Sequence, residues 1–328
     1  MPELSDVVER RFKVTGGAIL RVENPAGETR VHGTNGDDVV VRARKRIYAD
    51  SAEGGKRVLE NLEVQMEQSG NEIRIWQRAY MLERGWMNLF RERRAAVDYV
   101  IEVPRGSEVS VRSASGEIEV RAIEGPVELQ TVSGDVDIED VRGPLRLKTV
   151  SGDVDCVRCG GVIDANSVSG DLAFHACAWP SGHVRTISGD LLGEVRLGDG
   201  PFGLTTISGD VQLVTPSPFA LRFDTTSGDL QASGIPIEKL GRRTYAAHVG
   251  LEGADIIVHT VSGDVAVRSG DVDAPEVPAA AAKQDDARPS RASSAVADRK
   301  AQALDILKAL EQGEIDPDEA ARRLDSAR

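Results

Sequence analysis

The stretch from Val132 to Val168 reads VSGDVDIED VRGPLRLKT VSGDVDCVR CGGVIDANS V, and it decides the fold. It divides into nine-residue units, each with an apolar first residue, then a glycine, then two apolar residues separated by one polar residue. Alternate units carry Ser-Gly-Asp, so the full repeat is about 18 residues long. A fixed repeat of this kind is typical of stacked arrays in which each unit contacts only its neighbours.

Three positions of the unit are expected to face the core. The first holds Val132, Val141, Val150, Cys159 and Val168; the fifth holds Val136, Leu145, Val154 and Ile163; the seventh holds Ile138, Leu147, Cys156 and Ala165. Because apolar and polar residues alternate with a period of two, each half-repeat is predicted to be a β-strand with one face inward. The glycine allows the positive φ of a tight turn between strands.

The Ser-Gly-Asp turns recur in steps of 18 to 20 residues. They begin at Ser133, Ser151, Ser169, Ser188, Ser208 and Ser227, with a Ser-Gly-Glu copy at Ser115 and a further copy at Ser262. Coils stacked about 4.8 Å apart would pair each strand with its equivalents above and below. The predicted fold class is therefore all-β: a parallel β-solenoid (β-helix) of about 18-residue coils, with a flexible linker and a small C-terminal helical hairpin.

Four segments follow from the pattern. Residues 1–96 are expected to form irregular early coils and a cap, with a short helix at 50–61, strands near 62–67 and 72–77, and an insert. Residues 97–267 form the regular solenoid, residues 268–297 a disordered linker rich in Ala, Pro, Ser and Asp, and residues 298–328 the helical hairpin.

The insert at 79–95 breaks the strand pattern with a cluster of large apolar residues among arginines. Its apolar members include Trp86, Met87, Leu89 and Phe90. One interpretation is that the insert packs on the solenoid flank or cap. The other is that these four residues form an exposed patch for a partner or a membrane surface.

The last thirty residues have helical rather than strand spacing. Leu304, Leu307 and Leu310 recur on one predicted helix, Gly313 ends it, and a second predicted helix carries Leu324. A hairpin this small has little core of its own. These leucines are therefore expected to contact something else, either a protein partner or a second copy through self-association.

Composition limits the classes of partner. The 328-residue chain has a net charge of −13 and a pI near 5.0, which disfavours binding to nucleic acid. No run of eighteen apolar residues could span a membrane, and the N-terminal residues lack the apolar centre of a secretory signal. The expected location is the cytoplasm, with surface export left open.

Three cysteines allow a metal or a core interpretation. Cys156 and Cys159 form C-x-x-C, but Cys159 and Cys177 fall at the first apolar position of the unit, and Cys156 falls at the seventh. The register therefore favours three cysteines that face the core as small apolar residues. A zinc site would require a second pair of ligands. No cofactor is expected.

The turn aspartates form a candidate ladder: Asp135, Asp153, Asp171, Asp190, Asp210 and Asp229. Like charges about 4.8 Å apart repel by roughly 1 kcal/mol even in water, so something must compensate. Either each Asp bonds turn amides and faces solvent, or the ladder binds cations. Calcium-binding β-rolls carry Gly-Gly-x-Gly-x-Asp in every unit, whereas one glycine per unit is usual here.

The segments VIEVPRGSEVSV at 100–111, ASGEIEV at 114–120 and TVSGDVDI at 131–138 carry a family resemblance. The chain resembles, over about residues 30–265, the bacterial β-strand-repeat family of unknown function labelled putative adhesins. Its tail, DILKALEQGEIDPDEAARRL at 305–324, is similar to a SHOCT-like helical hairpin. The resemblance implies a β-solenoid without established catalytic residues, sometimes tied to cell-envelope stress. Its adhesin label implies export.

The expected function is therefore a non-enzymatic scaffold or binding protein. No nucleophile elbow, phosphate-binding loop or zinc-helix motif occurs in the sequence. The alternative is a cation-binding or carbohydrate-acting solenoid, because solenoid enzymes place paired carboxylates in a groove and outward carboxylates are present here.

Overall fold

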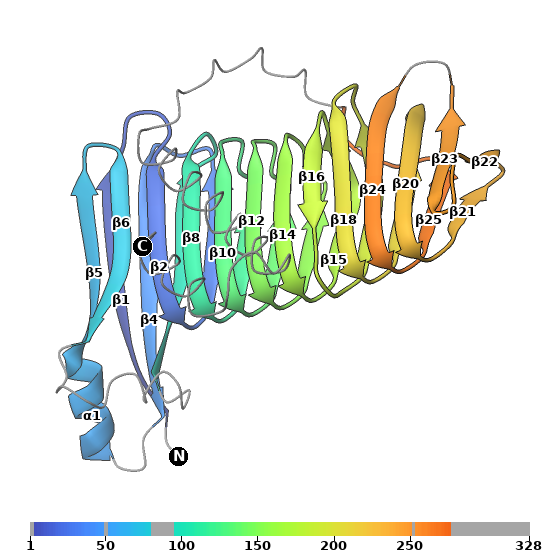
Figure 1. Ribbon diagram of the computed structural model, residues 1–328. Coiled ribbons are helices and arrows are strands. Elements are labelled where there is room, and N and C mark those ends of the chain that lie inside the picture. Colours follow the sequence, from blue (N-terminus) through green and yellow to red (C-terminus); the bar gives the residue numbers. More distant parts are fainter. Residues whose placement is uncertain (1–2, 49–51, 80–94, 251–252, 277–328) are drawn as a thin grey trace, which may run out of the picture. The chain divides into compact units, whose positions relative to one another are not determined.

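The computed structural model describes residues 3–48, 52–79, 95–250 and 253–276, which lie in the compact unit Met1–Ala279. The described strands form a 12-stranded and a 13-stranded sheet (Figure 1). Their inward side chains make one continuous core. The patches predicted around Trp86 and Leu304 lie outside the described residues, as does the linker from residue 277 onward.

Each coil of the body contributes one strand to each sheet. The body strands in the 13-stranded sheet are β8 (Glu108–Ser115), β10 (Val127–Ser133), β12 (Leu145–Ser151), β14 (Ile163–Ser169), β16 (Gly182–Arg185), β18 (Pro201–Ser208), β20 (Phe219–Ser227) and β24 (Ala254–Ser262). Their partners in the 12-stranded sheet are β9 (Ile118–Arg121), β11 (Val136–Glu139), β13 (Val154–Val157), β15 (Leu172–Trp179), β17 (Leu191–Leu197), β19 (Val211–Thr215), β21 (Leu230–Ser233) and β25 (Val265–Ser269). Neighbouring coils pair in parallel, and the predicted long parallel sheets are confirmed.

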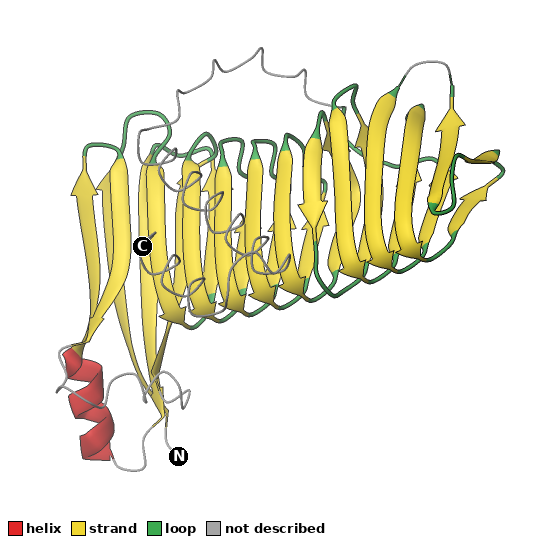
Figure 2. Cartoon of the chain, in the orientation of Figure 1, coloured by secondary structure: helices red, strands yellow, loops and turns green. Residues whose placement is uncertain are grey.

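The N-terminal end is an antiparallel cap with one helix (Figure 2). β4 (Asp38–Tyr48) pairs antiparallel with β1 (Glu3–Lys13) and β7 (Ala95–Pro104), and β5 (Leu62–Ser69) forms a hairpin with β6 (Glu72–Ala79). The predicted short helix is confirmed as α1 (Ala52–Asn61), as are the two strands after it. No helix in the described part of the chain is long and apolar enough to cross a bilayer.

The irregular early coils expected within residues 1–96 are limited to two of the first four strands. Only β2 (Ile19–Ala26) and β3 (Thr29–Thr34) form a coil, paired in parallel with β8 and β9. β1 and β4 each run for 11 residues without a turn glycine, so neither can bend into a half-coil. They instead pair with each other over their full length.

The coils do not stack in sequence order. The last coil, β24 and β25, inserts between the coil of β18 and β19 and the coil of β20 and β21 (Figure 1). β22 (Ile237–Lys239) and β23 (Thr244–Val249) pair antiparallel on the far side of β20 and close that end of the sheet. All three turns present the same Ser-Gly-Asp register, so the repeat itself could not reveal the order.

The prediction that the first position of every unit faces the core is half wrong. Val141 and Cys159 are buried, but Val132, Val150 and Val168 are on the solvent side. The difference lies in the preceding backbone. Positive φ values of 53–59° occur at four non-glycine residues, Ala122, Asp140, Arg158 and Ala176. Each lies directly before a buried residue, because this backbone conformation directs the next side chain into the core.

The three cysteines do face the core, as predicted. Cys156 pairs in register with Ile138 and Phe174, and all three thiols are free and no more than 1% exposed. Burial raises the pKa of the Cys156 thiol well above its ordinary value. The buried, protonated Cys156 thiol is a small apolar side chain rather than a nucleophile.

The turn glycines generate the first testable prediction. A Cβ at Gly152 (φ 124°) would lie 2.3 Å from the carbonyl oxygen of Gly134 in the adjacent coil, whereas a Cβ at Gly70 (φ 61°) would meet nothing within 4 Å. Gly152→Ala should therefore lower the free energy of unfolding by more than about 3 kcal/mol. Gly70→Ala, the matched control, should cost about 1 kcal/mol. Urea denaturation followed by circular dichroism measures both, and equal losses would contradict the stacking argument.

Candidate functional site

An aliphatic ladder runs along the solvent side of the 13-stranded sheet, next to the Ser-Gly-Asp turns. Each member is 42–54% exposed, and each directly precedes the serine of its turn. The members, in stacking order, are Val132, Val150, Val168, Ile187, Ile207 and Val261. The serines that follow them pair coil by coil, which fixes the alignment. Six exposed aliphatic side chains in one column are an unusual feature for a surface of solvated strands.

A polar ladder lies two residues before the aliphatic ladder on the same face. Its members pair in register from β8 to β24: Arg112, Gln130, Lys148, Asn166, Arg185, Thr205 and His259. Cations thus alternate with neutral residues from Arg112 to Thr205. In the part of the chain that the structure describes, neither Lys148 nor Arg185 forms an ion pair.

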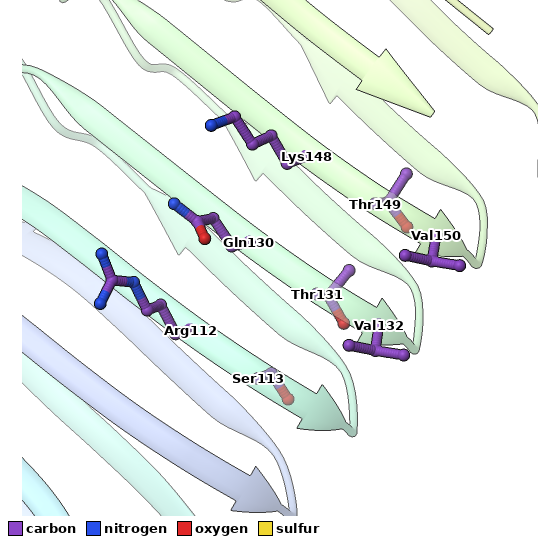
Figure 3. Close-up of a pocket in the computed structure, with 8 residues that line it drawn as sticks. All are labelled: Arg112, Ser113, Gln130, Thr131, Val132, Lys148, Thr149 and Val150. Carbon is purple, nitrogen blue, oxygen red and sulfur yellow. The ribbon is translucent and has the colours of Figure 1, made fainter. Parts of the chain in front are cut away.

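The two ladders border a shallow depression of about 290 Å³ (Figure 3). Arg112, Gln130 and Lys148 line one side, and Val132 and Val150 lie at the ends of their strands on the other. The lining therefore combines exposed methyl groups with long cationic and amide side chains. Such a surface suits contact with another macromolecule better than enclosure of a small molecule, because it is open to solvent.

A row of buried hydroxyls lies between the two ladders and points inward. Thr131, Thr149, Thr206 and Thr260 are at most 6% exposed, and their hydroxyls have no hydrogen-bond partner among the described residues. This inward row explains the alternation: since Thr131 faces inward, Val132 must face outward.

The turn aspartates form a continuous hydrogen-bonded ladder. In each step the backbone amide of one Asp donates to Oδ1 of the equivalent Asp in the adjacent coil, at 2.8–3.0 Å. The order is Asp135, Asp153, Asp171, Asp190, Asp210, Asp264 and Asp229. Asp264 was not foreseen as a member, because its coil is inserted out of sequence order. The carboxylates are thus held by amides that partly offset their mutual repulsion.

One acidic cluster elsewhere could be considered for a metal ion. Glu28, Glu117 and Glu119 offer carboxylate oxygens within 4.8 Å of one another. Burial, and then the neighbouring Glu28, raise the pKa of Glu117. Arg30 forms ion pairs with both Glu28 and Glu119, so its guanidinium already compensates much of this charge. The cluster therefore needs no metal to account for it.

The comparisons place the chain in a family. The profile of the family described as Toastrack DUF4097 matches residues 33–268. The chain belongs to this family. The family segment contains every coil described above except the strand β2, all but the last two residues of β3 and the last residue of β25, so the aliphatic ladder and the aspartate ladder lie within it.

Solved structures show only distant likeness. A putative adhesin from Bacteroides fragilis is 9% identical, covering 81% of this chain and 97% of that one, with a TM-score of 0.42. A putative lipid binding protein from Parabacteroides distasonis has the same identity and coverage and a TM-score of 0.40. A putative adhesin from Parabacteroides merdae is 6% identical, covering 81% and 96%, with a TM-score of 0.38. None of the curated proteins matches this sequence.

The aspartate ladder generates a second prediction. Asp171→Ala removes the acceptor of the Asp190 amide and should lower the free energy of unfolding by about 0.5–1.5 kcal/mol. Asp171→Asn keeps an acceptor oxygen and removes one of the closely spaced charges, so it should stay within about 0.5 kcal/mol of the unsubstituted protein. Urea denaturation compares the two variants. Equal destabilisation by Asn and Ala would mean that the charge, rather than the hydrogen bond, stabilises the turn.

Proposed function

We propose that this protein is a non-enzymatic binding scaffold that contacts protein partners through the aliphatic ladder and the polar ladder beside it. The supporting observation is the column of six half-exposed Val and Ile side chains on a solvated sheet face. The core is complete without them, since it is filled by the inward residues of both sheets. Burying these methyl groups in a complex would therefore add a favourable term of about 25 cal/mol per Å² of apolar surface.

The chemistry of the neighbouring ladders supports a protein partner. A nucleic acid would meet the aspartate ladder at the turn, where one carboxylate lies in each coil. The polar ladder offers amide, hydroxyl and guanidinium groups, which are typical of the rim of a protein interface. The predicted hairpin, with Leu304, Leu307, Leu310 and Leu324, stays a predicted second contact site for a partner or a second copy.

The cation-binding or carbohydrate-acting alternative finds less support. One oxygen of each ladder aspartate except the terminal Asp229 is already an acceptor for a backbone amide. The depression beside Lys148 is lined by cationic, amide and apolar side chains, without the paired carboxylates that glycoside cleavage uses. The binding-scaffold proposal accounts for both features, because the aspartates hold the coils together and the depression lies beside the aliphatic ladder.

A double substitution tests the proposal. Val150→Asp with Val168→Asp places two carboxylates in the aliphatic ladder and should weaken capture of protein partners from the native cell by at least about tenfold, because two apolar contacts become charged. The full-length chain serves as bait, and quantitative mass spectrometry measures the captured proteins. Both sites are exposed, so the free energy of unfolding should change by no more than about 0.5 kcal/mol for each substitution.

The matched control is Val162→Asp. Val162 is 46% exposed, comparable with Val150 at 47%, but it lies before β14 and outside the aliphatic ladder. This variant should capture partners as the unsubstituted protein does. If Val162→Asp and the double variant lost the same proteins to the same extent, or if neither lost any, the ladder would not be the contact surface.

A further inference from the structure

We infer that one occupant of the aliphatic ladder is a second copy of this chain, seated face to face so that the two aliphatic ladders meet and the two coil stacks run in the same direction. This inference rests on the proposed function of the ladder as a contact surface. It adds the identity and the orientation of the partner, and the observation that carries it is the order of the three ladders on the face.

The three ladders lie in a fixed left-to-right order. Along each coil from Gln130 to His259 the chain passes first through the polar ladder, then the aliphatic ladder, then the aspartate ladder, as in Lys148, Val150 and Asp153. The strands of these coils are parallel, so the order is the same in each, whereas Arg112 in the coil before them is followed by Ala114 and Glu117. The face therefore has cations on one side of the aliphatic column and carboxylates on the other.

Charge complementarity selects one of the two possible two-fold arrangements. If the two-fold axis is parallel to the direction of stacking, the polar ladder of one copy faces the aspartate ladder of the other, coil against the same coil. Lys148 then faces Asp153 of the second copy, and Arg185 faces Asp190 of the second copy. Each pair occurs twice because the contact is symmetric.

The opposite arrangement is repulsive. If the axis is perpendicular to the direction of stacking, the coil stacks run antiparallel, and each ladder faces its own equivalent. The arginines and lysine of the polar ladders would then face one another, and so would the two rows of aspartates, each with one carboxylate in every coil. Like charges held opposite one another destabilise an interface.

The size of the face sets the strength of the contact. Seven coils spaced by about 4.8 Å span roughly 29 Å, and the three strand steps from the polar ladder to the turn serine span about 10 Å, with the aspartates in the turn beyond it. A footprint of this size is below the ~800 Å² per partner that a stable interface typically buries. The association is therefore reversible, and trapping it requires a covalent crosslink.

Single cysteines test the arrangement in the full-length chain. Val150→Cys and Ile207→Cys lie in the second and fifth coils of the aliphatic ladder. Under a short bis-maleimide crosslinker, each variant alone should give a crosslinked dimer, at a yield at least tenfold above that of Val162→Cys, which is equally exposed but outside the ladder. The unsubstituted chain should give no dimer, because its three thiols are buried.

Two results would overturn the inference. Crosslinking only in the mixture of Val150→Cys with Ile207→Cys would show antiparallel stacks, since the second coil then meets the fifth. Yields of both variants no higher than that of Val162→Cys would show that a second copy does not occupy the ladder. In that case, loss of captured proteins by the double Asp variant would still support the proposed function, so the two failures are distinguishable.

Discussion

The close contact of backbone with backbone at the Ser-Gly-Asp turn is the constraint on which the rest of the structure depends. At Gly134, Gly152, Gly170, Gly189 and Gly209 a side chain would lie 2.1–2.3 Å from a carbonyl oxygen of the adjacent coil. Glycine therefore lets the coils approach to hydrogen-bonding distance in both sheets. The aspartate-to-amide bond adds one further link per coil at the same turn. As a result, residues at one position of the repeat form a continuous column.

Much of this arrangement could be predicted from the sequence because columns follow from a repeat. A position that is apolar in every unit, such as Ile138 and Cys156, has to face the same way in each coil, and both are buried. This prediction needed only the period of the repeat and the two-residue alternation of strands, both of which are visible in the sequence. Cys177 is also buried as predicted, but it shares the first position with the exposed Val168, and its inward direction follows the positive φ of Ala176.

The errors concern two properties that the repeat period does not determine: the direction of the side chain at the first position of the unit, and the stacking order of the coils. Val132 and Val141 occupy the same place in the nine-residue unit, yet the positive φ of Asp140 turns only Val141 inward. The residues that adopt this backbone conformation are Asp, Arg and Ala, so no glycine marks the position. Alternation from Thr131 would have indicated the outward position of Val132. The insertion of β24 between β18 and β20 was likewise hidden, because every coil offers the same register to its neighbours.

The aliphatic ladder has to be explained by something other than the fold. The residue before the turn serine is Ala114 in β8, at one end of the ladder, and Thr226 in β20, at the other end. This position of the coil therefore accepts small and polar residues. Strand propensity favours Val and Ile, but the polar ladder has the same extended backbone on the same face and carries Lys148 and Asn166. The structure of the coil therefore does not require Val or Ile at these exposed positions. Their confinement to six adjacent coils, with cations on one side and carboxylates on the other, fits a bounded contact surface rather than a consequence of building strands.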